Sequence, residues 1–130
     1  MKNTDFLGYC ESKYLRVSPY KVRKVADIVR KLNVIDALKL LKIQPQNAAT
    51  YIYKALYSAY HNAKNKGVTS DDLLYIDTII VDEAKQLKRF KARARGRAFS
   101  IVKRTCHIKI GLKEKESKNV KVGEANGTKD

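Results

Sequence analysis

Apolar residues recur at helical spacing in three stretches of the first half of the chain. The first stretch follows Ser18 and Pro19, which favour a helix start, because serine is a common N-cap and proline suits the first helical position. One face of this helix carries the apolar residues Val22, Val25, Val29 and Leu32. The pattern therefore predicts a helix that begins at residue 18 or 19.

Two further helices are predicted by their caps as well as by their periodicity. Asn33 can cap a second helix, with Asp36 at capping-box spacing, and this helix should end before Pro45. A third helix is predicted from about residue 47 to residue 66, with Gly67 as its C-terminal stop. Its apolar stripe consists of Ala49, Ile52, Leu56, Ala59 and Ala63.

Alternating and β-branched segments predict strands at 9–17, 73–81 and 101–112. Asp71 and Asp72 suit a turn before the second of these strands. The last two strands face each other across a long basic connection. We therefore expect an α+β fold, in which three helices pack on a small three-stranded antiparallel sheet, with a long projecting β-hairpin at about residues 82–102.

The length of 130 residues supports one domain, which we expect over residues 1–113, followed by a flexible tail at 114–130. The first residues lack the apolar segment of a signal peptide, so a cytoplasmic location is expected. Cys10 and Cys106 are far apart and have no metal-ligand spacing, which predicts two reduced thiols.

Charge is the unusual feature of the composition. The chain has 28 Lys and Arg residues against 13 Asp and Glu residues, a formal net charge of +15. Such a field attracts polyanions and opposes self-association, so nucleic acid is the expected partner and no homo-oligomer is expected. A membrane surface is the weaker alternative, because no apolar run is long enough to span a bilayer.

The basic residues concentrate in the connection between the two long strands. From Ala84 to Lys113 there are eleven Lys and Arg residues and no acidic residue. In an extended arm, Arg93, Arg95 and Arg97 would lie on one face as a row of guanidinium groups. An isolated ribbon of this kind is marginal in water and needs a partner such as RNA phosphates. A disordered basic loop that binds any polyanion explains the composition equally well.

A second basic cluster surrounds the start of the first predicted helix. It comprises Arg16, Ser18, Lys21, Arg23 and Lys24, which could bind phosphate at the helix N-terminus. The simpler alternative is a helix cap. Residues Tyr53, Tyr57 and Tyr60 of the third helix could stack on bases, but packing at the edge of the core is favoured.

The chain shows no pattern typical of an enzyme, and we expect no metal and no cofactor. His61 and His107 have no ligand spacing, and the neighbouring Asp82 and Glu83 would point to opposite faces of a strand. A nuclease is therefore disfavoured. A DNA-binding module is also disfavoured, because a recognition helix would carry base-reading Arg, Asn or Gln, whereas the third predicted helix offers Tyr and Ala on most faces.

Ordered motifs at both ends of the domain make the family comparison specific. They are the segment Val17–Arg30, Asn62-Ala63, Val81-Asp82-Glu83, Lys88-Arg89, Arg93-Ala94, Gly96-Arg97-Ala98 and Lys103–Ile108. Over about residues 8–113 the chain resembles the family of bacterial ribosomal protein twenty-two of the large subunit. The family commonly has proline before the Arg-Ala pair, where this chain has Ala92.

This resemblance implies a structural constituent of the large ribosomal subunit that binds large-subunit rRNA, supports its assembly and contacts neighbouring ribosomal proteins. It also implies that the hairpin lines the nascent-peptide exit tunnel, with its tip near the nascent peptide. The expected tip is Ala92, Arg93, Ala94, Arg95, Gly96, Arg97 and Ala98. The residues expected to bind rRNA are Arg16, Ser18, Lys21, Arg23, Lys24, Lys85, Lys88, Arg89, Lys91, Arg93, Arg95, Arg97, Lys103 and Arg104.

Overall fold

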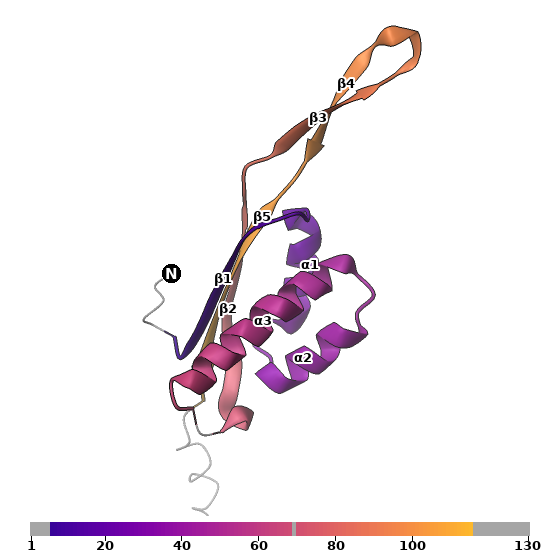
Figure 1. Cartoon of the computed structure of the whole chain (residues 1–130). Coiled ribbons are helices and arrows are strands. Elements are labelled where there is room, and N and C mark those ends of the chain that lie inside the picture. Colours follow the sequence, from indigo (N-terminus) through magenta and orange to yellow (C-terminus); the bar gives the residue numbers. More distant parts are fainter. Residues whose placement is uncertain (1–5, 69, 116–130) are drawn as a thin grey trace, which may run out of the picture.

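Along the chain, one strand comes first, the helices follow it, and the remaining strands come last. The computed structural model describes residues 6–68 and 70–115 (Figure 1). Within these residues the elements are β1 (Gly8–Leu15), α1 (Pro19–Val29), α2 (Val34–Ile43), α3 (Asn47–Asn65), the 3-10 turn η2 (Asp71–Leu73), β2 (Leu74–Glu83), β3 (Leu87–Ala92), the 3-10 turn η3 (Ala94–Gly96), β4 (Ala98–Lys103) and β5 (Cys106–Glu114). The predicted α+β class is confirmed.

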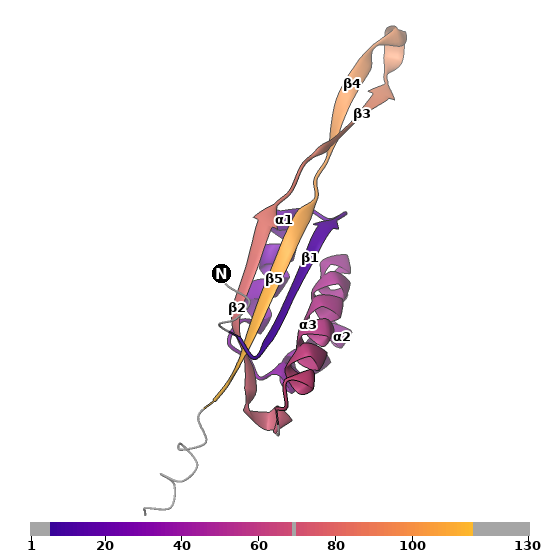
Figure 2. The same ribbon diagram turned by 60° about the vertical axis from the view of Figure 1, so that its left-hand side comes forward.

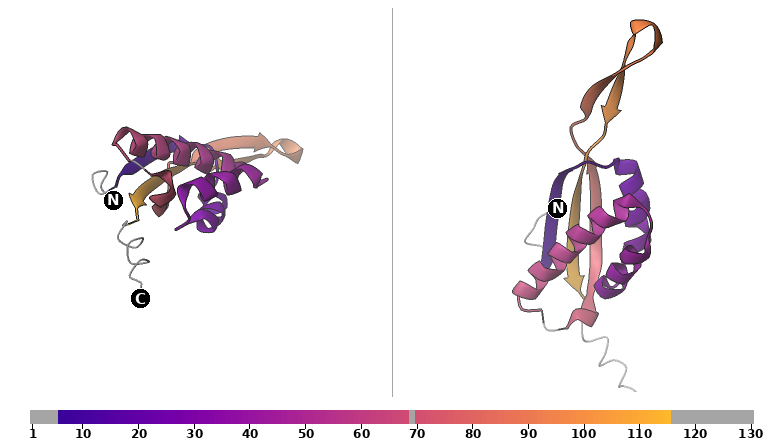
Figure 3. Two further views of the ribbon diagram at one scale, coloured as in Figure 1. Left: turned by 90° about the horizontal axis from the view of Figure 1, so that it is seen from below. Right: turned by 45° about the vertical axis from the view of Figure 1, so that its right-hand side comes forward.

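The body of the protein is a sheet covered by helices. The strand order is β1-β5-β2, and β5 is antiparallel to both neighbours. Figure 2 and the right-hand view of Figure 3 show the three helices on the same face of this sheet. The strand predicted at 101–112 has the expected alternation in its β5 part, where Cys106, Ile108, Ile110 and Leu112 are all fully buried.

The helices form where their apolar stripes can be buried. All five residues of the predicted α3 stripe are at most 1% exposed, and the small side chains of its three alanines allow α3 to lie close to β1. Asn33 caps α2 as predicted, because its side chain accepts a hydrogen bond of 2.9 Å from the Ile35 N–H. Gly67 ends the third helical segment with a positive φ of 91°, which glycine adopts without strain.

The outer edge of β2 is covered by basic side chains at α1 and just after it. Arg23 donates to the Val81 carbonyl at 2.9 Å, Arg30 to the Ile79 carbonyl at 3.0 Å, and the Lys31 ammonium to the Asp77 carbonyl at 3.0 Å. These bonds satisfy carbonyl groups that a neighbouring strand would otherwise pair. The edge is therefore protected, and α1 is held in a defined position beside the sheet.

The hairpin is a separate two-stranded ladder that projects away from the body (Figure 1). One strand was predicted over 101–112, but the structure divides this segment into β4 and β5, with a break at Arg104 and Thr105. The ladder of β3 and β4 pairs Leu87 with Lys103 at its base and Ala92 with Ala98 at its tip. The predicted tail lies outside the described residues from 116 onward, as do residues 1–5.

Candidate nucleic-acid interface

The basic residues of the described chain fall into two groups, those with a carboxylate partner and those without one. Within residues 6–68 and 70–115, every ion pair joins a carboxylate to a basic residue outside the predicted RNA-binding set. The basic partners are Lys13, Arg30, Lys31, Lys64, Lys109 and Lys113. None of the thirteen predicted RNA-binding Lys and Arg residues has a carboxylate within 4.0 Å in this part of the chain. Their charge is available to an external anion.

The base of the hairpin, α1 and α3 together enclose a depression of about 810 Å³, which we call the root groove. It is lined by Arg16, Val17, Ser18, Lys21, Lys24, Val25, Gln46, Asn47, Ala48, Val102, Lys103 and Arg104. Five of these residues are basic and none is acidic. The groove thus brings the predicted cluster at the start of α1 together with the last residues of β4, about eighty positions later in the sequence.

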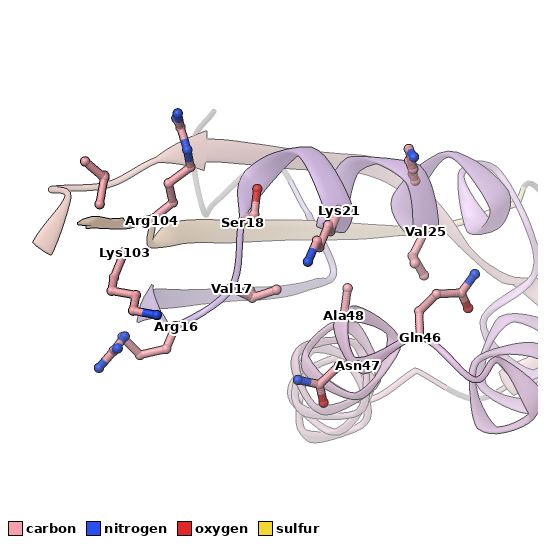
Figure 4. Close-up of a pocket in the computed structure, with 12 residues that line it drawn as sticks. Arg16, Val17, Ser18, Lys21, Val25, Gln46, Asn47, Ala48, Lys103 and Arg104 are labelled. Carbon is pink, nitrogen blue, oxygen red and sulfur yellow. The ribbon is translucent and has the colours of Figure 1, made fainter. Parts of the chain in front are cut away.

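Side chains of three basic residues gather along this groove (Figure 4). Arg16 and Lys103 extend toward the same end, and Lys21 points toward the start of α3 at Asn47 and Ala48. Arg104, in the break between β4 and β5, extends away from α3. Cations in close proximity repel one another, so an anion between them would be stabilised from several sides.

Both helices that begin at the root groove lack caps of their own. Ser18 stands at the N-cap position of α1, as predicted, but its side chain makes no capping hydrogen bond, and Gln46 before α3 makes none either. Neither helix has an acidic residue in its first turn. By contrast, α2 has the Asn33 cap and Asp36 in its first turn. The free N–H groups and positive ends of α1 and α3 therefore favour an anion in the groove.

Arg23 differs from the other predicted residues of this cluster. It lies outside the groove lining, and its guanidinium group is bonded to the Val81 carbonyl. This contact gives Arg23 a structural role in joining α1 to β2. An additional contact with RNA stays a prediction for this residue.

Along the hairpin, each cation of β3 faces an uncharged residue of β4. Lys88 pairs with Val102, Arg89 with Ile101, and Lys91 with Phe99. This register keeps like charges from lying directly opposite one another, which lowers the repulsion within the ribbon. All residues from 91 to 100 are exposed, so the distal hairpin makes no buried contact with the described body.

The tip of the hairpin does not have the predicted row of three arginines on an extended arm. Residues Ala94–Gly96 form a 3-10 turn, in which Arg95 and Gly96 both have positive φ, 65° and 73°. The Arg93 N–H donates to the Arg97 carbonyl at 2.6 Å and closes this turn. The prediction of one face was wrong, because the left-handed residues reverse the chain between Arg93 and Arg97.

Exposed aromatic rings accompany the charges of the hairpin. Phe90 is 76% exposed and Phe99 is 50% exposed, and the Arg93 guanidinium lies 5.8 Å from the centre of the Phe99 ring. Exposed rings beside cations can stack on bases or pack against a partner. Neither ring was among the residues predicted from the sequence to bind RNA.

Tyrosines of α3 largely follow the predicted packing role. Tyr53 and Tyr60 are partly buried against the core, whereas Tyr57 is 46% exposed and stacks on Tyr53 with ring centres 6.0 Å apart. The Tyr60 hydroxyl donates to Asp71 at 2.6 Å, and Lys64 lies 3.1 Å from the same carboxylate. The Tyr60 hydroxyl, followed by Lys64, lowers the pKa of Asp71.

The described residues contain no group of three or more His, Cys, Asp or Glu side chains that could hold a metal ion. Cys10 and Cys106 are both free, because β5 pairs Cys106 with Leu15 and places Ile110 opposite Cys10. Burial raises the pKa of the Cys106 thiol.

Among residues 6–68 and 70–115, no helix has the length and apolar character needed to cross a membrane.

Two lining residues of the root groove, Gln46 and Asn47, were not among the predicted site residues. Neither is charged, and both lie far in sequence from the basic clusters. No local signal could have identified them, because their position in the groove follows from the packing of α3 beside α1.

Comparison with known proteins places this interface in context. The family model described as ribosomal protein L22p/L17e matches residues 10–113. The large ribosomal subunit protein uL22 of Clostridium novyi (strain NT) is 47% identical over 104 residues, which cover 80% of this chain and 94% of that protein. The uL22 protein of Syntrophotalea carbinolica is 48% identical over 103 residues, 79% of this chain and 94% of that protein. This chain therefore belongs to the ribosomal protein L22p/L17e family.

Proposed function

We propose that this ribosomal structural protein, which is not an enzyme, binds the rRNA of the large subunit and supports its assembly. The observation that carries the proposal is the separation of charge. The thirteen predicted Lys and Arg residues lie in the root groove, beside it and along the hairpin, without carboxylate partners among the described residues. Phosphates are the partners that such a surface requires.

Within this function, the hairpin reaches into the subunit and lines the nascent-peptide exit tunnel. Its narrow two-stranded form and complete exposure from residue 91 to residue 100 suit an element that is surrounded by RNA. The tip, residues 92–98, would then lie near the nascent peptide. Many members of the family have proline at this position, and Ala92 leaves the φ angle less restricted than proline would. The chain reversal at the tip is made by Arg95 and Gly96, which both have positive φ.

Residues 1–113 act as one rRNA-binding domain, which is supported by a single buried cluster that joins the helices to the sheet. The protein contacts neighbouring ribosomal proteins, does not form homo-oligomers and resides with the ribosome in the cytoplasm.

Sedimentation of a lysate at low magnesium tests ribosomal residence. The dissociated subunits are separated and the chain is followed by quantitative mass spectrometry. We expect one copy per large subunit, retained after a high-salt wash. Recovery in the soluble pool or with nucleoid DNA would reject the proposal.

Salt dependence of binding by the purified full chain tests the role of the hairpin. If the hairpin makes about eight phosphate contacts, the slope of log K against log salt with a large-subunit rRNA fragment should be near −6. A flat response would contradict binding through phosphates. Tighter binding to a DNA duplex of equal length would contradict the preference for rRNA.

A further inference from the structure

We propose that the root groove holds the phosphodiester backbone of an unpaired RNA segment, and that this segment joins the hairpin base to the body. The inference rests on the rRNA binding proposed above. It adds the kind of RNA structure that the groove accepts, and it adds Gln46 and Asn47 to the residues that line the site.

Positive groups from three separate parts of the chain meet in this groove. Arg16 follows β1, Lys21 belongs to α1 and Lys103 ends β4. Figure 4 shows Arg16 and Lys103 extending toward one end of the groove, while Lys21 points to the N-terminal end of α3. A cation at a helix N-terminus is unfavourable, and so is a cation beside another cation. An anion between each of these pairs would convert repulsion into attraction.

The helix ends supply further groups that a phosphodiester backbone can use. The uncapped first turns of α1 and α3 present main-chain N–H donors beside the cations. The polar side chains of Ser18, Gln46 and Asn47 lie along the same lining. Hydroxyl and amide groups can donate to phosphate oxygens and can also bond the ribose 2′-hydroxyl. The combination matches a sugar–phosphate chain better than it matches a single ion.

Shape favours an unpaired segment over a duplex. A volume of about 810 Å³ lies within the range of roughly 300–1,000 Å³ that is typical of clefts and cavities that bind small ligands. This space accepts the backbone of a few nucleotides, whereas a duplex is a wide rod that a concave site of this size cannot surround. An unpaired strand bends into such a site and brings successive phosphates to opposite walls. It would then contact both Lys103 of the hairpin and Lys21 of the body.

The test uses the full chain and two fluorescent RNA probes, an eight-nucleotide oligouridylate and an eight-base-pair blunt RNA duplex. The groove variant is Arg16→Gln/Lys21→Gln/Lys103→Gln. The matched control is Lys39→Gln/Lys42→Gln/Lys54→Gln, which removes the same charge from exposed residues of α2 and α3 outside the groove. Dissociation constants are measured by anisotropy over a range of salt, and folding of each variant is verified by circular dichroism.

We expect the groove variant to bind the oligouridylate about a hundredfold more weakly, at roughly fivefold for each lost contact. Its salt slope should become less steep by about 2, since each single-strand phosphate contact contributes about 0.7. The control should change affinity by less than about fivefold and keep its slope. Duplex binding should fall equally in both variants. If the triple groove variant does not fold, Lys21→Gln alone should weaken oligouridylate binding about fivefold relative to Lys54→Gln.

Three results would overturn the proposal. Equal loss of oligouridylate binding in the groove and control variants would show that only overall charge matters. A duplex loss as large as the single-strand loss would reject the preference for unpaired RNA. Displacement of the oligouridylate by polyglutamate at equal charge concentration would identify the groove as a site for an acidic protein. If the wild-type chain sediments with the large subunit, each of these results rejects the groove alone and leaves the proposed function intact.

Discussion

The hydroxyl of Thr105 donates a hydrogen bond of 2.7 Å to the main-chain carbonyl of Lys85. Thr105 lies at the break between β4 and β5, is only 4% exposed and also accepts a main-chain bond of 3.0 Å from Ala84. These two bonds join the arms where the hairpin leaves the body. Because the ladder of β3 and β4 begins only at Leu87, they define the direction in which the hairpin starts.

Replacement of Thr105 by valine should therefore loosen the hairpin base without changing the volume of the side chain. We expect the free energy of unfolding to fall by about 1 kcal/mol, because the partly buried hydrogen bond to the Lys85 carbonyl is lost. Hydrogen exchange of the Ala84 amide should become faster. Thr50→Val, at an exposed position of α3, is the matched control and should have little effect on either quantity. Equal effects of the two substitutions would contradict this role.

Two buried glycines of the sheet should differ in their tolerance of alanine. A Cβ at Gly8 would collide with the Ala59 carbonyl oxygen and would lie 2.8 Å from Ala63 Cβ, so backbone would have to move. The nearest atoms to a Cβ at Gly111 belong to the Phe6 ring, a side chain that can rotate. Measured by urea unfolding, the free energy of unfolding should fall by about 3 kcal/mol for Gly8→Ala and by about 1 kcal/mol for Gly111→Ala. The reverse order would show that α3 adapts more easily than Phe6.

Arg23 and Lys24 are neighbours in sequence with different expected roles. Arg23→Ala removes the donor to the Val81 carbonyl and should lower the free energy of unfolding by about 1 kcal/mol. Lys24, which is exposed and lines the root groove, should tolerate alanine with little loss of stability. Lys24→Ala should instead weaken binding of the oligouridylate about fivefold. Measuring unfolding and RNA binding for both variants separates the two roles, and identical profiles would refute the distinction.

The Tyr60–Asp71–Lys64 cluster should make stability depend on pH at both extremes. The pKa of Asp71 is lowered from 3.8, so its contribution is lost as pH falls below about 4. The pKa of Tyr60 is raised from 10.0, chiefly by its hydrogen bond to Asp71 and by burial, so its contribution is lost as pH rises above about 10. Tyr60→Phe should flatten the curve of unfolding free energy against pH at both ends. Tyr57→Phe on the same helix serves as control and should leave the curve unchanged.

Local periodicity was sufficient to identify most elements of the body. The stripe from Ala49 to Ala63 and the alternation from Cys106 to Leu112 are repeats of a helix and a strand, and both are buried as predicted. The same reasoning failed at the hairpin tip. Alternation of Arg93, Arg95 and Arg97 implies one face only if the backbone stays extended, whereas Arg95 and Gly96 adopt positive φ and reverse the chain.

Amino-acid types and short motifs are properties of single or neighbouring positions. They were sufficient to establish the basic composition of the chain, its resemblance to a family and the identity of most proposed RNA-binding residues. The root groove does not follow from them. Lys21, Asn47 and Lys103 are separated by tens of residues, and they line one groove because α1 and α3 pack on the sheet while β5 carries the hairpin base past their N-termini. Sequence spacing describes contacts within an element, whereas contacts between elements depend on which apolar faces are buried against each other.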